Sequence, residues 1–396
     1  MIFQTFDDKN QCVLFYEEGD FHEALGENST HTWSYVPYLK EKENILYAQL
    51  FVEGQNLEKY LSPASLHEWH GLQHQMKACF VATGKVGLKI DEHCLYDLLP
   101  PHLLKKWAEI KNEGCEKVFA THKQPLHYDH LLKINKMVSH IKEQPLNLDL
   151  SQLIRITVQD KNIYKLITEN PPYIKYNMFN TITGRLSTAR GSFPVMTLAK
   201  KYRNILIPNN DWLFEMDYNA CELRVALALL SQEQPDEDLH EWNLENVFQR
   251  AKSRDNAKKR IFSWLYNPNS KDEAISKVYD REKLKTLYYR DNKVHTPFGR
   301  QIECEEYYAV NYLIQSTAAD LVFEQMYKVW EYLQHPQRKS FIKFCNHDSV
   351  MIDLHSEQEY EFNEIKELFS NTRFGKFKVN CLGGKNWAAM KELHIK

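Results

Sequence analysis

The chain has 396 residues, of which 43% are hydrophobic and 26% are charged. That length suits two or three packed units of roughly 100–200 residues each, and the apolar content excludes an intrinsically disordered chain. The formal net charge of -3 excludes a basic surface over the whole chain, so any nucleic-acid partner would have to be held by local basic patches.

The chain opens with "MIFQTFDDKN", which contains no signal-peptide pattern. The eight cysteines are dispersed without a C-x-x-C pair, and no apolar run approaches the ~18 residues that span a bilayer. We therefore expect a reduced, cytoplasmic setting with no membrane partner. Within residues 1–100, the β-like runs "CVLFYEE" and "ILYAQLFVEG" alternate with the helical "LHEWHGLQHQMKACFVAT". This alternation predicts a small α/β region, whose role the sequence does not indicate.

The next segment, from "PPHLLKKWAEIKN" to "YDHLLKINKMVSHIKEQ", is rich in lysine and has a helical pattern. Leu131, Leu132, Ile134, Val138 and Ile141 recur near helical spacing. We expect a projecting helical element here.

A strand that leads into a helix is predicted by "DWLFEMDYNACELRVALALLS". Asp217 ends the strand, and Glu222 lies just inside the helix. A carboxylate near a hydrophobic core costs free energy unless it is paired or bound to a cation. We therefore expect a partner for Asp217 elsewhere in the chain.

A second aspartate has a similar setting near the C-terminus. The segment "FIKFCNHDSVMIDL" predicts two strands that meet at a tight turn, with Asp348 at its tip. One sheet could present Asp217 and Asp348 together to Mg²⁺, which prefers oxygen ligands and bridges carboxylates to substrate phosphates. Two such ions, about 3.5–4 Å apart, can support an in-line phosphoryl displacement. Aspartates also end strands as ordinary turn residues, so this pair alone is not specific.

Between the two aspartates, "RDNAKKRIFSWLY" predicts a helix with two different faces. Two cations followed by two aromatic rings recur every fourth residue at Arg254, Lys258, Phe262 and Tyr266. An apolar stripe lies roughly a quarter-turn away, at Ala257, Ile261, Trp264 and Leu265. The first face suits a triphosphate at one end and a sugar and base at the other. A solvated basic helix is the alternative interpretation of this pattern taken alone.

These segments together resemble the motifs of family A DNA polymerases, the group of bacterial polymerase I and its phage relatives. "DYNACELR" is similar to motif A, D-Y-S-Q-I-E-L-R, and "RDNAKKRIFSWLY" to motif B, R-x3-K-x3-F-x3-Y. "NHDS" is similar to motif C, H-D-E. "TITGRLST", "NYLIQSTAADL" and "GGKNW" resemble T-x-T-G-R-L-S-S, N-x3-Q-G-T-A-A-D and the terminal G-x-N-W. Because the motifs keep the family's order between residues 175 and 390, chance is a poor explanation.

The resemblance implies an α+β, right-hand polymerase fold of palm, fingers and thumb, with a small N-terminal α/β region. We expect that N-terminal region at residues 1–100, a thumb-like helical region at 101–175, and palm and fingers at 176–396, with the fingers at about 232–300. Residues 1–100 are too short for the usual proofreading exonuclease, and no D-x-E opens their first strand. We therefore predict no 3′–5′ exonuclease, and hypothesise that a separate exonuclease or processivity factor exists.

The resemblance also implies an activity. The chain would add deoxynucleotides (dNTPs) to the 3′-OH of a primer on template DNA and release pyrophosphate. It would use two Mg²⁺ ions, which Mn²⁺ could replace. Its compact size is most similar to that of a phage replication enzyme, which would act in the cytoplasm of a bacterial host.

Residue roles follow from the same resemblance. The metal ligands would be Asp217, Asp348 and the carbonyl of Tyr218, with Lys258 as the proton donor to pyrophosphate. The nucleotide-binding residues would be Arg254, Lys258, Phe262, Tyr266, Glu222 and His240, where Glu222 excludes a ribose 2′-hydroxyl. The contacts to primer and template DNA would be Arg185, Asn311, Gln315 and His347, which would bind shape rather than sequence.

The chain departs from the family pattern in several places. Ser349 stands where motif C usually has glutamate, so that third acidic group is absent. Asn219 and Ala220 replace the serine and glutamine of motif A, while Asn267 and Ser316 replace glycines. Both metal carboxylates are kept.

Two alternative functions stay open. One is a single-subunit RNA polymerase, a neighbouring family that also uses H-D-S; Glu222 and the short chain argue against it, because that family has a small residue at the ribose position. The other is an inactive nucleic-acid-binding replication accessory. The presence of Asp217, Lys258 and Asp348 argues against it, since binding alone would not require metal carboxylates.

Overall fold

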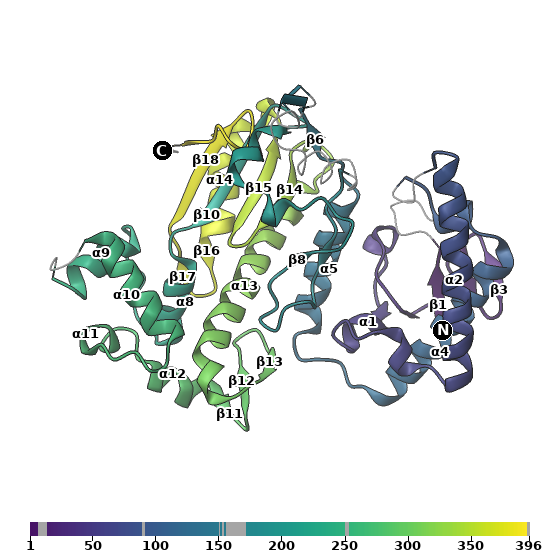
Figure 1. Cartoon of the computed structure of the whole chain (residues 1–396), viewed down its shortest axis with the longest axis horizontal. Coiled ribbons are helices and arrows are strands. Elements are labelled where there is room, and N and C mark those ends of the chain that lie inside the picture. The colour runs from purple at the N-terminus through teal and green to yellow at the C-terminus, as the bar shows by residue number, and fades with distance from the viewer. Residues whose placement is uncertain are drawn as a thin grey trace. The chain divides into compact units, whose positions relative to one another are not determined.

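The chain folds into two compact units, Met1–Glu143 and Gln144–Lys396 (Figure 1). This computed structural model describes residues 1–6, 14–88, 92–149, 151–152, 154–155, 172–249 and 253–393. The division after residue 143 does not coincide with the predicted boundaries at residues 100 and 175. A thumb-like role for residues 101–175 stays a prediction, and 150, 153 and 156–171 of that range lie outside the described residues.

The first unit packs helices against small sheets. Its strands are β1 (Phe3–Thr5), β2 (Phe15–Glu17), β3 (Asp20–His22), β4 (His31–Thr32) and β5 (Leu46–Tyr47). β1, β2 and β3 form an antiparallel sheet in that order, and β4 pairs with β5 in parallel. Its described helices are α1 (Ala48–Phe51), α2 (Pro63–Lys85), α3 (Leu95–Leu98), α4 (Pro101–Thr121), α5 (Tyr128–Lys142) and the 3-10 turns Pro37–Glu41 and Leu57–Tyr60.

Helix α4 forms the centre of this unit, because it contacts α1, α2 and β1. Its buried face includes Leu104, Ala108 and Val118. The predicted helical pattern in α5 is confirmed, since the apolar positions are buried apart from the half-buried Leu132. The compact unit Met1–Glu143 thus contains both lysine-rich helices as well as residues 1–100.

One predicted β-like run is wrong in part. "ILYAQLFVEG" contributes only the short strand β5 before the chain turns into α1. Ala, Gln and Leu, which open α1, favour helix over strand. The backbone N–H of Tyr47 donates to the hydroxyl of Tyr128 at 3.0 Å instead of extending a sheet ladder. Tertiary contact with α5 thus decides the local structure.

The second unit is built on an antiparallel sheet in the order β14-β15-β10-β18-β19 (Figure 1). These strands are β10 (Trp212–Tyr218), β14 (Phe341–Asn346), β15 (Ser349–Leu354), β18 (Val379–Gly384) and β19 (Lys391–Glu392). Shorter pairings involve β6 (Asn147–Leu148), β7 (Tyr176–Asn177), β8 (Ser187–Thr188), β9 (Leu206–Ile207), β11 (Tyr289–Arg290), β12 (Lys293–His295), β13 (Gln301–Glu303), β16 (Asn371–Thr372) and β17 (Gly375–Lys376). β10 lies inside the sheet and buries Phe214 and Met216 completely.

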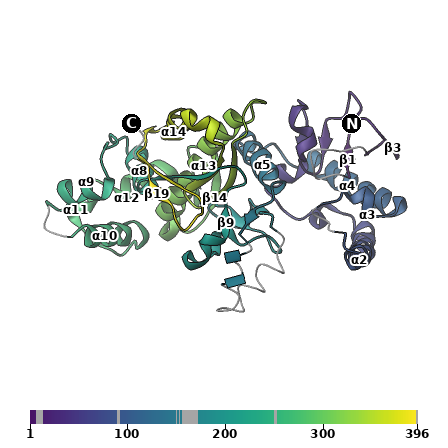
Figure 2. The same cartoon turned by 90° about the horizontal axis from the view of Figure 1, so that it is seen from above.

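Helices of the second unit pack around the long helix α13 (Glu306–Leu333), which contacts α8, α10, α12 and α14. The other described helices are α8 (Cys221–Leu229), α9 (Leu239–Asn246), α10 (Arg254–Tyr266), α11 (Glu273–Ser276), α12 (Arg281–Tyr288), α14 (Phe362–Ser370) and the 3-10 turns Val195–Thr197, Lys200–Ile205 and Ser356–Glu361. α9, α10, α11 and α12 gather at one end of this unit, beyond the sheet, in both views (Figures 1 and 2). The predicted strand-to-helix segment, the hairpin and the helix of "RDNAKKRIFSWLY" are all confirmed.

The described part of the chain contains no helix that is both long and apolar enough to cross a membrane.

Candidate active site

Two carboxylates meet at one end of the central sheet. β10 and β15 pair antiparallel, and Asp217 lies directly opposite Ser349, the residue after Asp348. β14 and β15 are joined by a two-residue turn in which His347 has a φ of 56°. The left-handed conformation of His347 closes the turn tightly and leaves Asp348 next to the end of β10. The predicted partner of Asp217 is therefore Asp348.

The electrostatics of this pair favour a cation. Burial raises the pKa of Asp217 to about 7, and the charges of Asp348 and Glu215 add to the rise. Burial also raises the pKa of Asp348, although Arg185 and His347 oppose the effect. A raised pKa of this kind means that the surroundings supply too little positive charge to compensate the negative charge of the ionised carboxylate. Divalent cations supply the missing positive charge.

The donor set fits Mg²⁺ better than a closed structural metal site. Among the described residues, no group of three or more His, Cys, Asp and Glu side chains is arranged to hold a metal ion. Mg²⁺ commonly uses one or two carboxylates, keeps several waters and shares substrate phosphates. The backbone carbonyl of Tyr218 is well fixed for a further contact, because the Tyr218 ring stacks on Phe369 with centroids 4.4 Å apart and its hydroxyl donates to the Phe369 carbonyl.

A third carboxylate lies near this pair, and the sequence analysis missed it. The hydroxyl of Ser349 donates to Oε1 of Glu215 at 2.8 Å. Glu215 and Asp217 are two residues apart on β10, so their side chains share one face of the sheet. Ser349 is thus bonded to an acid from the neighbouring strand. Period-two alternation along "FEMDY" is the signal that could have identified Glu215.

Arg185 and Glu222 form an ion pair beside the carboxylates. Burial raises the pKa of Glu222, which Arg185 opposes and Asp348 reinforces. These interactions bring the predicted DNA contact Arg185 and the predicted ribose gate Glu222 together next to Asp348. Their separate roles stay predictions.

The loop that carries Arg185 needs a glycine. Gly184 has a φ of +75°, and a Cβ atom on it would lie 2.6 Å from the guanidinium carbon of Arg300. That guanidinium donates two hydrogen bonds, at 3.1 and 2.8 Å, to the fully buried carboxylate of Asp320 on α13. A buried ion pair of this kind is rigid, because neither partner can be exchanged for water. Arg300 therefore lies directly against the loop from which Arg185 projects, and leaves no room for a side chain at Gly184.

The two predicted faces of α10 are confirmed. Ala257, Ile261, Trp264 and Leu265 are all buried. On the other face, Arg254 and Lys258 are exposed, while the rings of Phe262 and Tyr266 are half-buried and stack with centroids 5.7 Å apart. The helix thus presents two cations and a stacked aromatic pair along one line.

His240, at the start of α9, lies beside this face. Its ring centroid is 6.3 Å from that of Phe262. Burial, with the charge of Lys258, lowers the pKa of His240 to about 4, so the imidazole is neutral near pH 7. Its buried Nδ1 has no hydrogen-bond partner among the described residues. A neutral ring with one free nitrogen can still bond to a ligand.

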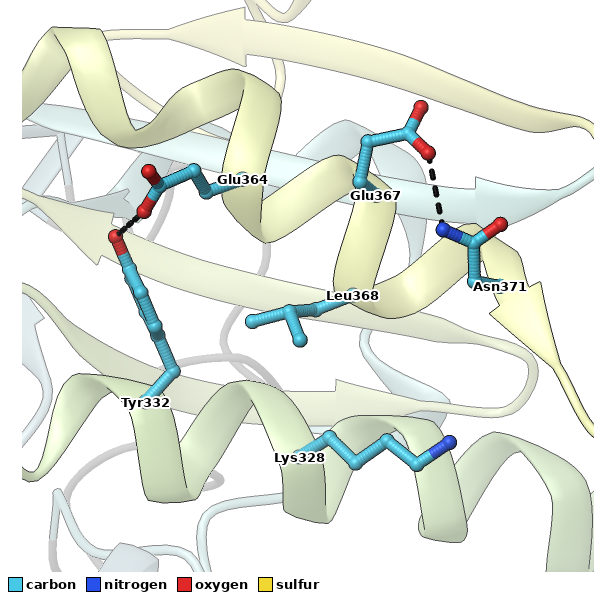
Figure 3. A pocket seen from close by; sticks show the side chains of 6 residues that line it. All are labelled: Lys328, Tyr332, Glu364, Glu367, Leu368 and Asn371. Carbon is cyan, nitrogen blue, oxygen red and sulfur yellow. Dashed lines mark hydrogen bonds between the residues drawn. The ribbon is translucent and has the colours of Figure 1, made fainter.

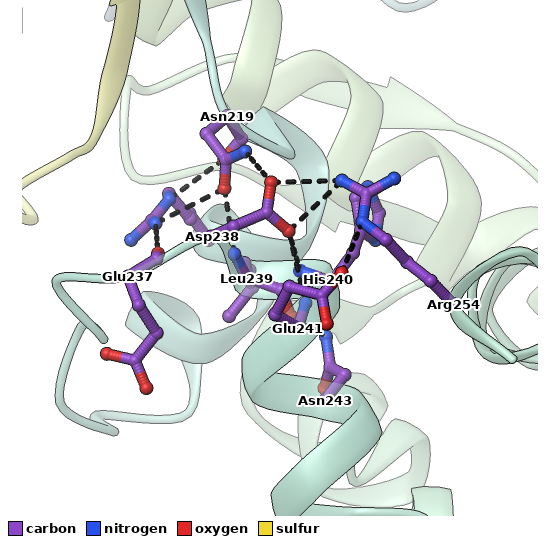
Figure 4. Close-up of polar contacts among 9 residues, drawn as sticks. Asn219, Glu237, Asp238, Leu239, His240, Glu241, Asn243 and Arg254 are labelled. Atoms are coloured by element: carbon purple, nitrogen blue, oxygen red, sulfur yellow. Dashed lines mark hydrogen bonds and ion pairs between the residues drawn. The ribbon is translucent and has the colours of Figure 1, made fainter. Parts of the chain in front are cut away.

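Arg254 is held by two acids (Figure 4). Its Nη2 donates to both carboxylate oxygens of Asp238, at 3.1 and 3.0 Å, and its Nε lies 3.0 Å from Oε1 of Glu241. Although burial alone would raise the pKa of Asp238, hydrogen bonds from Asn219 and Glu241 and the charge of Arg254 lower it. The sequence analysis identified Arg254 but neither of its partners.

The remaining predicted DNA contacts are less closely tied to the carboxylates. Asn311 and Gln315 lie one turn apart on α13, which packs against α8 and β14. The buried Oδ1 of Asn311 has no hydrogen-bond partner among the described residues. His347 is exposed at the hairpin tip. No contact among the described residues joins Asn311 or Gln315 to Asp217 or Asp348.

A separate surface pocket lies between α13 and α14 (Figure 3). Its lining residues are Lys328, Tyr332, Glu364, Glu367, Leu368 and Asn371. None of the predicted site residues lines it.

No protein-family model matches the sequence, and no curated protein matches it. The fold is similar to that of a solved structure, the POL domain of Pol1 from M. smegmatis in complex with a DNA primer-template and a dNTP. The TM-score is 0.62 with 14% sequence identity, over 86% of this chain and 81% of that chain. At this identity the similarity concerns the fold alone, which resembles that of a solved DNA polymerase domain.

Proposed function

We propose that this chain is a template-directed DNA polymerase of the family A type. It would add dNTPs to the 3′-OH of a DNA primer and release pyrophosphate. The observation that carries the proposal is the pairing of Asp217 opposite Ser349, which brings two half-buried, poorly compensated carboxylates together. Support comes from the cationic and aromatic face of α10 and from the similarity in fold to the POL domain.

The residues of this chain would act mainly by positioning. Arg254 and Lys258 would bind the triphosphate, with the neutral His240 beside them. Phe262 and Tyr266 would pack against the sugar and base. In the reaction, the primer 3′-OH loses its proton to solvent, its oxygen forms a bond to the α-phosphorus, and the bond from that phosphorus to the pyrophosphate oxygen breaks. Lys258 would give a proton to the leaving pyrophosphate.

Asp217, Asp348 and the Tyr218 carbonyl would hold two Mg²⁺ ions, or Mn²⁺ in their place, whose positive charge stabilises both the attacking and the leaving oxygen. Glu222 would exclude a ribose 2′-hydroxyl, with Arg185 holding its carboxylate. Arg185, Asn311, Gln315 and His347 would contact primer and template. In the right-hand polymerase fold, the sheet that contains β10 and β15 would be the palm, and α9–α12 would be the fingers.

The setting of the activity also belongs to this proposal. A compact chain without an intrinsic 3′–5′ exonuclease would suit phage DNA replication in a bacterial cytoplasm, with a separate exonuclease or processivity factor as partner. No D-x-E opens the first strand of residues 1–100, so this exonuclease signature is not found within them.

Primer extension tests the proposal directly. The wild type should extend a primed DNA template with dNTPs and Mg²⁺, and poorly with ribonucleotides. Asp348→Asn should lower the rate by about 1,000-fold or more, because the metal charge stabilisation that it removes is worth several kcal/mol. Asp291→Asn, an exposed turn position with φ +53° where asparagine is well tolerated, is the matched control.

Each other outcome identifies a competing function. Preferred addition of ribonucleotides would favour the single-subunit RNA polymerase, for which Ser349 is the supporting residue. DNA binding without any extension, unchanged in Asp348→Asn, would favour an inactive replication accessory.

A further inference from the structure

Asp238 is the centre of a hydrogen-bond network that links the end of β10 to the start of α10 (Figure 4). One carboxylate oxygen accepts from the backbone N–H groups of His240 and Glu241, at 2.9 and 3.1 Å, and so caps α9. The other accepts from the side-chain amide of Asn219 at 2.8 Å. Both oxygens also accept from Arg254. A single carboxylate thus joins two predicted triphosphate contacts, His240 and Arg254.

Asn219 anchors this network two residues after Asp217. Its Oδ1 accepts from the backbone N–H of Leu239 at 2.8 Å, so the amide cannot rotate without loss of that bond. The fully buried Arg224 holds the same segment, because its guanidinium donates to the carbonyls of Asn219, Pro235 and Glu237 at 2.8, 2.8 and 2.9 Å. The positions of Asp238 and Asp217 are therefore fixed relative to each other.

The guanidinium of Arg254 is occupied along one edge only. Asp238 binds Nη2 and Glu241 binds Nε, while no contact of Nη1 is found among the described residues. Guanidinium carries five N–H donors, so Nη1 can bind a phosphate oxygen while Asp238 still holds the other edge. An exchange of Asp238 for the phosphate is not required. The geometry suits a residue that holds Arg254 in place, rather than one that blocks it.

We propose that Asp238 is a positioning residue that fixes Arg254 at a set distance from the Asp217 carboxylate, with Asn219 as its anchor. The inference rests on the proposed function and adds residues to it: Asn219 and Asp238 determine where the triphosphate lies. Arg254 is half-exposed on a long side chain, which would otherwise sample many rotamers. Asp238 removes most of that freedom before the nucleotide arrives.

The variant Asp238→Asn isolates this role. Asparagine is a good N-cap, so one side-chain oxygen can still cap α9. Its amide nitrogen then faces the donors of Asn219 and Arg254, so Arg254 loses one of its two hydrogen bonds to this side chain and the negative charge that held it, and keeps its contact with Glu241. The dissociation constant of a dNTP, measured on a complex with a primer-template that ends in a dideoxynucleotide, should rise by about 2- to 10-fold. This factor corresponds to the free-energy cost of ordering one long side chain on binding. The KM for dNTP should rise by the same factor, with kcat changed less.

A double-mutant cycle provides the decisive comparison. In an Arg254→Gln background, Asp238→Asn should have little further effect on dNTP affinity, since no guanidinium remains to position. Glu237→Gln is the matched control, because it removes a neighbouring charge whose carboxylate points away from the network (Figure 4). Thermal unfolding of each variant verifies that the protein is folded.

Several results would overturn the inference. Unchanged dNTP affinity in folded Asp238→Asn would do so. Tighter binding would also do so, because it would mean that the negative charge of Asp238 only repels the triphosphate. An equal loss with and without Arg254 would assign Asp238 a structural role. If the wild type fails to extend primers, both the proposed function and this inference are wrong. If the wild type extends primers and Asp238→Asn has the same dNTP affinity and KM, only this inference is wrong.

Discussion

Replacing Asp217 by asparagine should make the metal-free protein more stable at pH 8 while it abolishes nucleotide addition. Burial raises the pKa of Asp217 to about 7 from an ordinary value of 3.8, with Asp348 and Glu215 adding to the rise. The native state therefore disfavours the ionised carboxylate that the unfolded chain accommodates freely. Asparagine has nearly the same shape and carries no charge, so it removes this penalty.

The size of the effect follows from linkage. Each pKa unit corresponds to about 1.4 kcal/mol, so the full rise would amount to about 4 kcal/mol. Part of it is repulsion shared with Asp348, and the side chain is partly solvated, so we expect a gain of about 2 kcal/mol in the free energy of unfolding. A gain of that size is a large fraction of the stability of a typical domain.

The pH dependence has a defined sign. Below pH 3.8, Asp217 is protonated in both states and carries no penalty. Between pH 3.8 and about 7, the native state binds more protons at this site than the unfolded state does, so stability falls as the pH rises. Above pH 7 the penalty is complete. The stability of Asp217→Asn should lack this decline, and the two proteins should differ little near pH 4 and most at pH 8.

Urea unfolding in EDTA at a series of pH values measures the difference. Because the chain has two compact units, hydrogen exchange of the β10 amides should be followed beside the global signal. At pH 8, Mg²⁺ should stabilise the wild type and have a smaller effect on Asp217→Asn. A stability difference that does not change between pH 4 and pH 8 would refute this account of the Asp217 environment.

Two further predictions concern the neighbouring residues. Gly184→Ala should lower the free energy of unfolding by about 2–4 kcal/mol in urea, since a Cβ would both strain a φ of +75° and displace Arg300. Gly191 has a φ of +76°, and a Cβ atom on it would meet nothing within 4 Å, so Gly191→Ala should lower the free energy of unfolding only by the cost of backbone strain. Equal losses of stability in the two variants would contradict the role given to Arg300. Glu222→Ala should reduce the preference for dNTPs over ribonucleotides by about 10- to 200-fold in primer extension. An unchanged preference would show that another residue excludes the 2′-hydroxyl.

The sequence alone predicts the parts of this site that depend on local periodicity. The strand before Asp217, the hairpin around Asp348 and the two faces of α10 all have a clear alternation or helical spacing, and all three are confirmed. Motif resemblance added the pairing of the segments, which spacing could not supply. The fold class of a DNA polymerase domain agrees with the similarity in structure.

Contacts between distant segments are what the sequence could not predict. The bond from Ser349 to Glu215 depends on the register between β10 and β15. The hydrogen bonds from Arg254 to Asp238 depend on the conformation of the loop that joins α8 to α9. The division of the chain after residue 143 follows from contacts, since both α4 and α5 contact α1 in the first unit. Each depends on contacts between distant segments: alternation along β10 could place Glu215 on the face of Asp217, but it does not indicate which residue of another strand Glu215 will meet.

The core, rather than the site, determines where the carboxylates lie. Along β10, Phe214 and Met216 are fully buried, while Glu215 and Asp217 are half-buried between them. A shift of one residue would send Asp217 into the apolar face and expose Met216, at a cost of several buried side chains. The ladder to β15 and β18 is thus fixed by apolar burial, and it opposes the repulsion between Asp217 and Asp348. Apolar burial along β10 therefore holds the two like charges of Asp217 and Asp348 together at this end of the sheet.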